Sequence, residues 1–297
     1  MGSRFEGRVA IVTGASRGIG ARLAELLARE GAAVLVAARS EAVWNKRLPG
    51  TIGETAGKIA ASGGQALAVK ADMIVDADLV DLVAKAKDRF GTVDLLVNNA
   101  AVTVPGRPPA ARGTRSVGQP AAVAPATAAR VAPESSGSFL TFPLKGYRLH
   151  FEVNVFAAYR LMQLVLPGMV DLGRGSILNI TSDASRRPAD GPYQHTSGTT
   201  PFAYGGSKAA LEHLTRAVAY EMQPHGVSVN ALMPSMAVAT PGLLYQAPDL
   251  PQQVSMESFC EAAARMLAAH SDEMNGQVLY SEDVLHPELG RRGWIGG

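Results

Sequence analysis

Tyr204 and Lys208 stand four positions apart in a segment, Ala203 to Met222, whose apolar spacing predicts a helix. Residues four apart on a helix lie on one face, one turn apart. A phenol with its ordinary pKa of about 10 is a poor proton donor near neutral pH, and a neighbouring ammonium lowers that pKa by stabilising the phenolate. We expect such a pair to transfer protons. A surface pair without chemistry has the same spacing, so further signals are needed.

A glycine-bearing turn supplies the second signal. Val9 to Val12 predicts a short strand and Ile19 to Arg29 a helix. Glycines between them permit a tight turn in which backbone N–H groups approach a pyrophosphate, and the helix N-terminus adds partial positive charge. The turn therefore predicts a dinucleotide site, the alternative being a turn that is merely tight. The residues expected to contact the dinucleotide are Gly14, Ser16, Arg17, Gly18, Ile19 and Gly20.

Short apolar segments rich in β-branched residues predict the other strands, with helix-length segments such as residues 77–90 between most of them. Apolar strands that alternate with helices indicate a doubly wound α/β fold, in which a mostly parallel sheet is buried on both faces. We predict one domain over residues 1–297. The six further strands are expected at Ala33–Ala37, Ala66–Val69, Val93–Val97, Ser176–Ile180, Val227–Leu232 and Gln277–Tyr280.

Three irregular segments interrupt this pattern. Residues 101–137 are dominated by Ala, Pro and Gly, and their prolines forbid a regular helix. A surface insertion is expected there, with a lid over the site as the alternative. Residues 185–201 predict a second loop insertion, and residues 243–256 predict a flexible cover after the sixth strand.

Five motifs in order along the chain resemble those of the short-chain dehydrogenase/reductase family. They are the turn G-x-x-x-G-x-G after Thr13, Asn98-Asn99-Ala100, Asn154, Ser182, and the segment from Tyr204 to Lys208. The resemblance runs from about Phe5 to Leu285. It implies a seven-stranded Rossmann fold and an oxidoreductase that interconverts a carbonyl and a secondary alcohol. Residues 46–51 and 281–283 look like those of a hydroxysteroid dehydrogenase-like branch.

The resemblance also implies roles for the catalytic residues. Tyr204 is expected to be the general acid and base in hydride transfer, and Lys208 to bind the nicotinamide ribose as well. Ser182 follows a predicted strand, so its hydroxyl is expected to face the ligand crevice and hydrogen-bond the substrate oxygen. Asn154, on a predicted helix, is expected to hold a water on the proton route beyond the lysine.

The end of the second predicted strand bears on the choice of cofactor. Ala38 stands where NAD-specific members of the family carry an acidic residue, and Arg39 follows it. Arg17 can add a second guanidinium for a 2′-phosphate, so NADP is favoured over NAD. The alternative is that both arginines are ordinary surface charges.

Three further residues are carried over as cofactor contacts by resemblance. Asn99 lies in the motif after the fourth predicted strand. Asp72 matches an adenine-contacting aspartate, although a helix cap or turn would explain it as well. Thr240 lies one position later than the commonest spacing of the threonine that meets the carboxamide.

Composition narrows the class of protein. The formal net charge of +2 argues against a nucleic-acid partner, and one cysteine, Cys260, excludes an internal disulfide and multi-cysteine metal sites. No segment reads as a membrane span or signal peptide, so we expect a cytoplasmic protein with a small-molecule substrate and no membrane partner. The resemblance implies a homodimer or homotetramer. The rival hypothesis is an NADP(H)-binding sensor or regulatory protein with little turnover.

Overall fold

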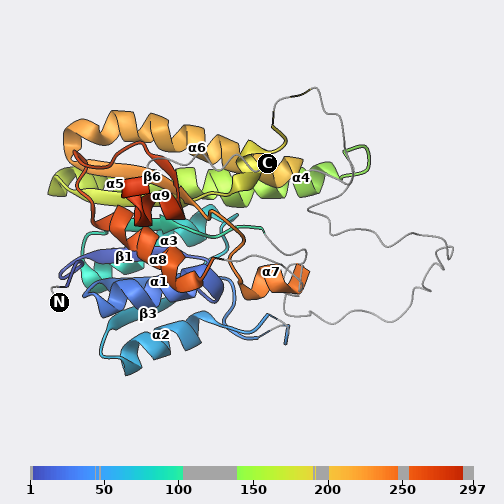
Figure 1. The fold of residues 1–297 in the computed structure, drawn as a ribbon. Helices are drawn as coiled ribbons and strands as arrows, with labels where there is room; N and C mark the ends of the chain where they lie inside the picture. The colour runs from blue at the N-terminus through green and yellow to red at the C-terminus, as the bar shows by residue number, and fades with distance from the viewer. Residues whose placement is uncertain are drawn as a thin grey trace, which may run out of the picture.

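The computed structural model describes residues 3–43, 45–46, 48–102, 139–189, 191, 201–246 and 254–289. Its seven strands form one sheet in the order β3-β2-β1-β4-β5-β6-β7, and every neighbouring pair is parallel (Figure 1). The predicted doubly wound fold is confirmed. The strands are β1 (Val9–Thr13), β2 (Ala33–Ala38), β3 (Gln65–Lys70), β4 (Leu95–Asn98), β5 (Gly175–Ile180), β6 (Val227–Met233) and β7 (Val278–Tyr280).

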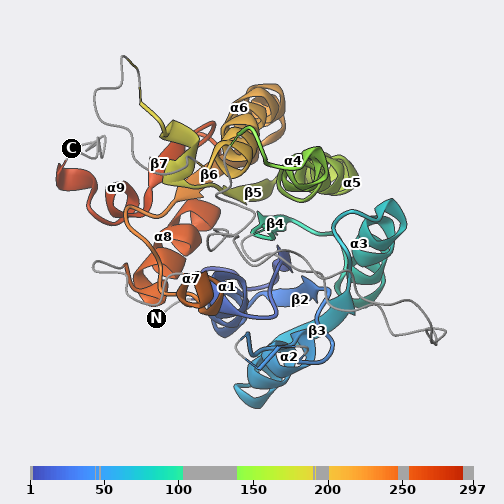
Figure 2. The same ribbon diagram turned by 90° about the vertical axis from the view of Figure 1, so that its right-hand side faces the viewer.

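Helices cover both faces of the sheet (Figure 2). On one face lie α1 (Gly18–Arg29), α2 (Ile52–Ala61) and α8 (Met256–Ala268), which share a core with β1 and β2. On the other lie α3 (Asp76–Phe90), α5 (Ala157–Leu172) and α6 (Phe202–Met222). Because parallel strands are buried on both faces, all of β1, β4, β5 and β6 is buried, as their apolar sequences predict.

The remaining helical pieces are short. They are α4 (Leu144–Phe151), the π-turn η2 (Glu152–Phe156), the 3₁₀ turn η3 (Asp183–Arg186), η4 (Gln223–His225), α7 (Pro241–Gln246), α9 (Ser281–Leu285) and η5 (Pro287–Leu289). The predicted insertion at 101–137 lies almost wholly outside the described residues, as does most of the predicted loop at 185–201. The predicted cover at 243–256 begins inside α7, and residues 247–253 lie outside the described residues.

One continuous helical run, Leu144–Leu172, is long and apolar enough to pass a test for a membrane span by length and composition. Its side chains Leu161, Val165 and Met169 are buried against the sheet. Because these side chains fill one of the two cores, the run is a core helix of the α/β fold.

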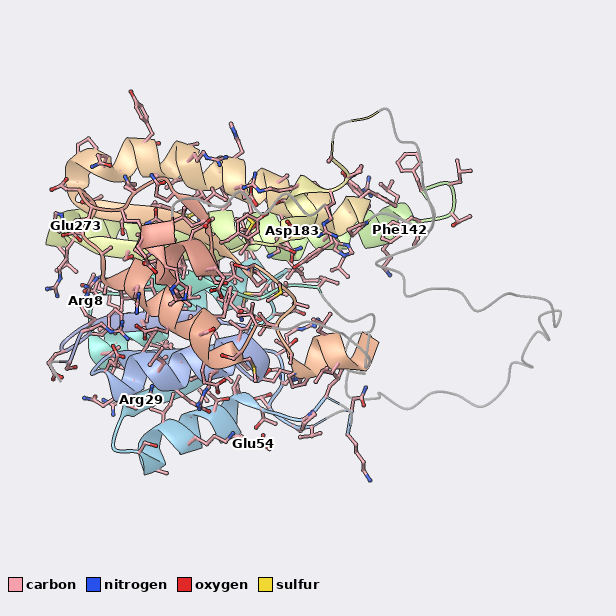
Figure 3. The ribbon with its side chains drawn as sticks, in the orientation of Figure 1. Arg8, Arg29, Glu54, Phe142, Asp183 and Glu273 are labelled. Carbon is pink, nitrogen blue, oxygen red and sulfur yellow. The ribbon has the colours of Figure 1, made fainter. Side chains whose placement is uncertain are left out.

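The amino edge of the sheet is closed by a buried carboxylate. Asp94, whose side chain is 1% exposed, pairs with Arg8 and with Arg174 at 3.3 Å. Its second oxygen accepts the backbone N–H of Val9 at 2.9 Å. These contacts tie the start of β1 to the approach to β4. Figure 3 shows Arg8 at this end of the molecule and Asp183 toward the opposite end.

Candidate active site

The predicted site residues gather at the carboxyl edge of the sheet, around β1, β4 and β5. The chain moves from β1 outward to β2 and β3, and from β4 outward to β5, β6 and β7. Ligands of open α/β sheets bind in the crevice outside the carboxyl ends, at the point where the strand order reverses. In this chain that point lies between β1 and β4, which are hydrogen-bonded neighbours.

The turn after β1 requires its glycines. Gly14 and Gly18 have positive φ values of 66° and 57°. A Cβ on Gly14 would lie 2.9 Å from the Ala100 Cα, and a Cβ on Gly20 would lie 2.6 Å from the Gly14 oxygen. Helix α1 then begins without a side-chain cap and without an acidic residue in its first turn. Its N-terminus therefore suits an anionic group, which fits the pyrophosphate of a dinucleotide.

Thr13 and Asn99 hold this turn against the end of β4. The Thr13 hydroxyl accepts the backbone N–H groups of Asn99 and Ala100, each at 3.0 Å. The Asn99 amide donates to the Thr13 carbonyl at 2.8 Å. The side chain of Asn99, predicted as a cofactor contact, thus shapes the cradle in this structure.

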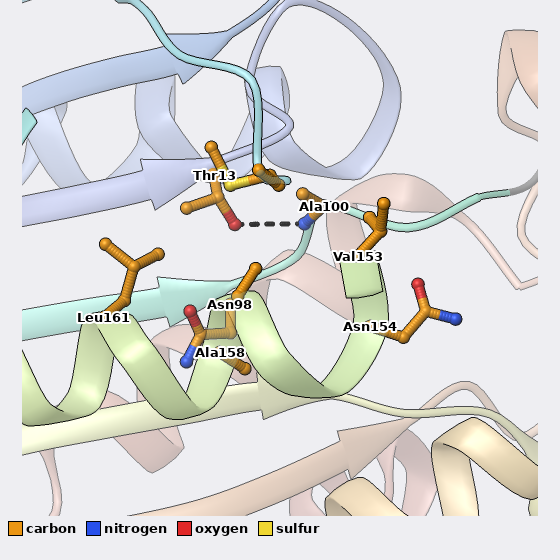
Figure 4. A pocket seen from close by; sticks show the side chains of 9 residues that line it. Thr13, Asn98, Ala100, Val153, Asn154, Ala158 and Leu161 are labelled. Carbon is orange, nitrogen blue, oxygen red and sulfur yellow. Dashed lines mark hydrogen bonds between the residues drawn. The ribbon is translucent and has the colours of Figure 1, made fainter. Parts of the chain in front are cut away.

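Thr13 and Ala100 also line a small cavity between the end of β4 and the helical run of Asn154 (Figure 4). It measures about 10 Å³, the least space that a single water needs. It is too small for an organic substrate. It is lined by Thr13, Met73, Asn98, Ala100, Val153, Asn154, Ala157, Ala158 and Leu161.

Tyr204 and Lys208 lie in the first two turns of α6, as their spacing predicts. Tyr204 makes a side-chain hydrogen bond with Ser182, which follows β5. The Lys208 Nζ donates to the Ile180 carbonyl at 2.7 Å and lies 5.7 Å from the centroid of the Tyr204 ring. The structure therefore brings together three of the four predicted catalytic side chains.

Asn154 joins this group through α6. It lies in the π-turn η2 and is 2% exposed. Its amide donates to the Ser207 hydroxyl at 2.9 Å, which donates in turn to the Tyr204 carbonyl at 2.7 Å. Its oxygen accepts the Val102 N–H at 3.3 Å. In this structure Asn154 thus reaches the Tyr204 backbone through the Ser207 hydroxyl.

Burial dominates the electrostatics of the pair. It raises the pKa of Tyr204, although the hydrogen bond with Ser182 acts in the opposite direction. It lowers the pKa of Lys208 to about 8, while the Glu212 carboxylate raises it. The expectation that the ammonium lowers the pKa of the phenol is wrong for this structure. The physical reason is desolvation of the phenol, with the ammonium bonded to the end of β5.

Two buried residues near Tyr204 were not predicted. Glu212, 5% exposed, lies one turn after Lys208, and the spacing 204, 208, 212 on one helix face was the available signal. His150, 3% exposed, lies four residues before Asn154 and has its ring centroid 6.3 Å from that of Tyr204. Its Nδ1 bonds the Gly146 carbonyl at 2.9 Å. Burial and the nearby Lys208 lower the pKa of His150.

The guanidinium groups of Arg17, in the glycine turn after β1, and Arg39, after β2, lie near each other. Arg39 is exposed and follows Ala38, the last residue of the strand. Arg17 is half-buried and donates to the Ser40 hydroxyl and the Gly50 carbonyl, each at 3.2 Å. Burial first, and then the positive charge of Arg39, lower the pKa of Arg17. This repulsion is what a shared anion between the two groups would relieve.

The other predicted cofactor contacts are positioned as follows. Asp72 lies in the turn after β3, where its side chain accepts the Ile74 N–H at 3.4 Å, and the N-cap of α3 is Val75. Thr240 lies against the glycine turn, because a Cβ on Gly18 would be 3.4 Å from its side chain. Ser16 is buried, and Ile19 packs against the core beside α8.

Known proteins resemble this chain in sequence and in fold. The family model for short chain dehydrogenases matches residues 8–116 and 123–243. The 7alpha-hydroxysteroid dehydrogenase of Escherichia coli is 30% identical over 240 residues, which are 81% of this chain and 74% of that protein. A solved 7 alpha-hydroxysteroid dehydrogenase, complexed with NADH and 7-oxo glycochenodeoxycholic acid, has a TM-score of 0.70 at 27% identity and covers 93% of each chain.

Ketoacyl reductase HetN of Nostoc sp. is 28% identical over 234 residues. The match covers 79% of this chain and 65% of that protein, just under two thirds of its length. Because the family model matches most of the sequence, the chain belongs to the short-chain dehydrogenase/reductase family. It is an oxidoreductase of that family with the Rossmann-like fold, similar to its hydroxysteroid dehydrogenases, and the family uses NAD(P) cofactors.

Proposed function

We propose that the protein is an NADP-dependent oxidoreductase that interconverts a carbonyl and a secondary alcohol, with Tyr204 as the general acid and base. One observation carries the proposal: Ser182, Tyr204 and Lys208 converge after β5, at the same carboxyl edge of the sheet as the glycine turn. Such convergence at the strand ends is where α/β enzymes bind their ligands.

The bound nicotinamide cofactor supplies the hydride in reduction and accepts it in oxidation. In reduction, Tyr204 donates the proton of its hydroxyl to the substrate oxygen, and in oxidation it takes that proton back. Ser182 hydrogen-bonds the same oxygen and holds it against the phenol. Lys208 holds its ammonium 5.7 Å from the centroid of the Tyr204 ring, and its proposed role is to bind the nicotinamide ribose.

The preference for NADP rests on Arg17 and Arg39. Their proximity, and an alanine rather than an acid at the end of β2, support a site for a 2′-phosphate. A related structure holds NADH, so the family alone does not decide the preference. Asp72, Asn99 and Thr240 remain proposed contacts of the same dinucleotide.

The substrate that we propose is a small or medium organic carbonyl or alcohol with apolar surface. Phe142 lies 6.2 Å from His150 and 5.1 Å from Phe202 between ring centroids, so aromatic rings extend from Tyr204 along α4. Relatives named for ketoacyl and hydroxysteroid substrates support such a class. We further place the enzyme in the cytoplasm, as a homodimer or homotetramer.

The test is oxidation of NADPH and, separately, of NADH by the purified protein against a panel of ketones, aldehydes, quinones and 3-oxoacyl thioesters. We expect substrate-dependent oxidation of NADPH that falls about 1,000-fold in Tyr204→Phe, as loss of a general acid predicts. Tyr220→Phe is the control, because this tyrosine of the same helix is 87% exposed. Tight NADPH binding without turnover on any substrate would favour the sensor hypothesis instead.

A further inference from the structure

A single carboxylate in α6 receives three donors from the segment that carries Ser182. The Glu212 Oε1 accepts the Thr181 hydroxyl at 2.8 Å and the Ser185 hydroxyl at 2.6 Å. Its Oε2 lies 3.4 Å from a nitrogen of the Arg186 guanidinium. Glu212 is 5% exposed and Thr181 is buried, so their hydrogen bond is shielded from water, whereas the Arg186 side chain is 44% exposed.

The donors lie on both sides of Ser182. Thr181 precedes it directly after β5, and Ser185 and Arg186 belong to the 3₁₀ turn η3, which begins after it. Ser182 itself is extended, with a φ of −159°, and its hydroxyl accepts the Ala184 N–H at 3.3 Å. The segment is thus tied to α6 before and after the serine.

The helix and the turn also approach each other closely. A Cβ on Gly205, next to Tyr204, would collide with the Ala184 carbonyl oxygen. Glycine at position 205 therefore lets the backbone of the turn lie against α6. Glu212 lies seven residues after Gly205 on the same helix. The 3₁₀ turn η3 is therefore held against α6 at two points, by close packing at Gly205 and by hydrogen bonds to Glu212.

We propose that Glu212 is a positioning residue, which fixes Ser182 against Tyr204 by tying Thr181, Ser185 and Arg186 to the helix of the general acid. This inference rests on the proposed function. The residue does not contact substrate; it acts through the serine. A displacement of about 1 Å in a catalytic group costs roughly 100-fold in rate, so such a tie has a measurable consequence. Loss of the carboxylate would leave buried hydroxyls without an acceptor.

Two substitutions separate the roles of oxygen and charge. Glu212→Gln keeps an oxygen at the position that accepts both hydroxyls and loses the charge that faces Arg186 and Lys208. Glu212→Leu removes both. At a pH well below the pKa of Lys208, where the ammonium stays protonated without the Glu212 charge, we expect Glu212→Leu to lower kcat roughly 10- to 100-fold. The KM for NADPH should stay unchanged there, since Ser182 is the group that is displaced. We expect Glu212→Gln to restore most of that loss.

Asp94→Asn is the matched control. Asp94 is as deeply buried and also bonds three groups, but at the amino edge of the sheet. It should lower the melting temperature and leave kcat unchanged. Equal kcat losses in Asp94→Asn and Glu212→Leu would show a general effect of stability and overturn the proposal, as would a wild-type kcat in Glu212→Leu.

A measurement without turnover keeps the two proposals apart. Amide hydrogen exchange reports local opening of a segment. In Glu212→Leu we expect faster exchange over residues 182–187 than in the wild type, and no such change in Glu212→Gln or Asp94→Asn. Unchanged exchange in Glu212→Leu overturns the positioning role even if a substrate is found. Faster exchange in a protein that oxidises no NADPH would leave the tie intact and refute the proposed activity.

Discussion

The two edges of the sheet use the same chemical group for different purposes. At the amino edge, Asp94 meets two guanidinium groups and a backbone N–H of β1, so it joins strands that already pair with each other. At the carboxyl edge, Glu212 accepts the hydroxyl of Thr181, directly after β5, and that of Ser185 in the 3₁₀ turn η3. It lies 3.4 Å from the Arg186 guanidinium of the same turn. The Asp94 carboxylate reinforces strands that are already hydrogen-bonded to each other. The Glu212 carboxylate fixes a segment that follows β5, beyond the hydrogen bonds of the sheet.

This difference separates contacts that stabilise the fold from contacts that position catalytic side chains. Removing one partner of a paired, buried charge lowers the free energy of unfolding, whichever edge of the sheet the pair lies at. The effect on rate depends on whether the group that moves is a catalytic one. The carboxyl edge should therefore lose activity faster than stability, and the amino edge should do the reverse.

The largest effect is expected at Asp94. Replacing it with Asn removes the charge that pairs with Arg8 and Arg174, whose side chains are 19% and 57% exposed, and loss of a charge-assisted hydrogen bond costs about 1.5–3 kcal/mol. Urea unfolding should show a lower free energy of unfolding by about that amount. The kcat of the folded protein should be unchanged, and a large loss of kcat would mean that the two edges are not independent.

The next effect concerns the cofactor. Arg39→Asp should weaken NADPH binding about 10- to 100-fold more than NADH binding, since a charge-assisted hydrogen bond contributes about 1.5–3 kcal/mol. Fluorescence titration with each dinucleotide measures the ratio. Arg29→Asp is the control, because Arg29 is exposed in the last turn of α1 toward the amino edge (Figure 3). Equal weakening of both dinucleotides would contradict the NADP preference.

A smaller effect is expected in the pH dependence of the rate. The pKa of Lys208 is lowered by burial to about 8, so its ammonium is lost as the pH rises through that value. We expect kcat/KM to decline above about pH 8, since this ratio reports groups of the free enzyme. The groups near Lys208 are the Tyr204 ring, His150 and Glu212.

Glu212→Gln should move this decline to lower pH, because the carboxylate raises the pKa of Lys208. Asp94→Asn, at the other edge, should leave the profile where it is. A decline at the wild-type pH in Glu212→Gln would show that the carboxylate does not act on the lysine.

The smallest effect is expected at His150. Its folded pKa lies below the ordinary 6.5, because burial disfavours the charged ring. The unfolded chain then binds a proton that the folded protein does not, so stability is full above pH 6.5 and falls as the pH falls below it. Melting temperatures of His150→Phe should depend less on pH between 7 and 5.5 than those of the wild type. His225→Gln, an exposed residue before β6, should behave like the wild type.

The sequence predicts the elements well because their signals are local. The strands are predicted from the two-residue period and apolar character of β-structure, and the shared helix face of Tyr204 and Lys208 from the 3.6-residue period of the α-helix. In the structure each strand begins and ends within two residues of its expected bounds. The partners of Glu212 could not be predicted, since Thr181 and Glu212 are 31 residues apart and meet through packing. The direction in which the Tyr204 pKa shifts depends on how deeply the phenol is buried, and the four-residue spacing of Tyr204 and Lys208 does not indicate that burial.

The π-turn at Glu152–Phe156 has a consequence for protein engineering. A π-turn accommodates one more residue than an α-helical turn, and each residue of an α-helix advances the chain about 100° around the axis. Deleting one residue there would convert the π-turn to a regular α-helical turn and rotate α4 about the helix axis. α4 would then present a different face to α6. His150 and Tyr147 would then face a different quadrant, while α5 kept its place on the sheet. A single-codon deletion is thus a route to reorienting the Tyr147 and His150 rings of α4 without substituting either residue.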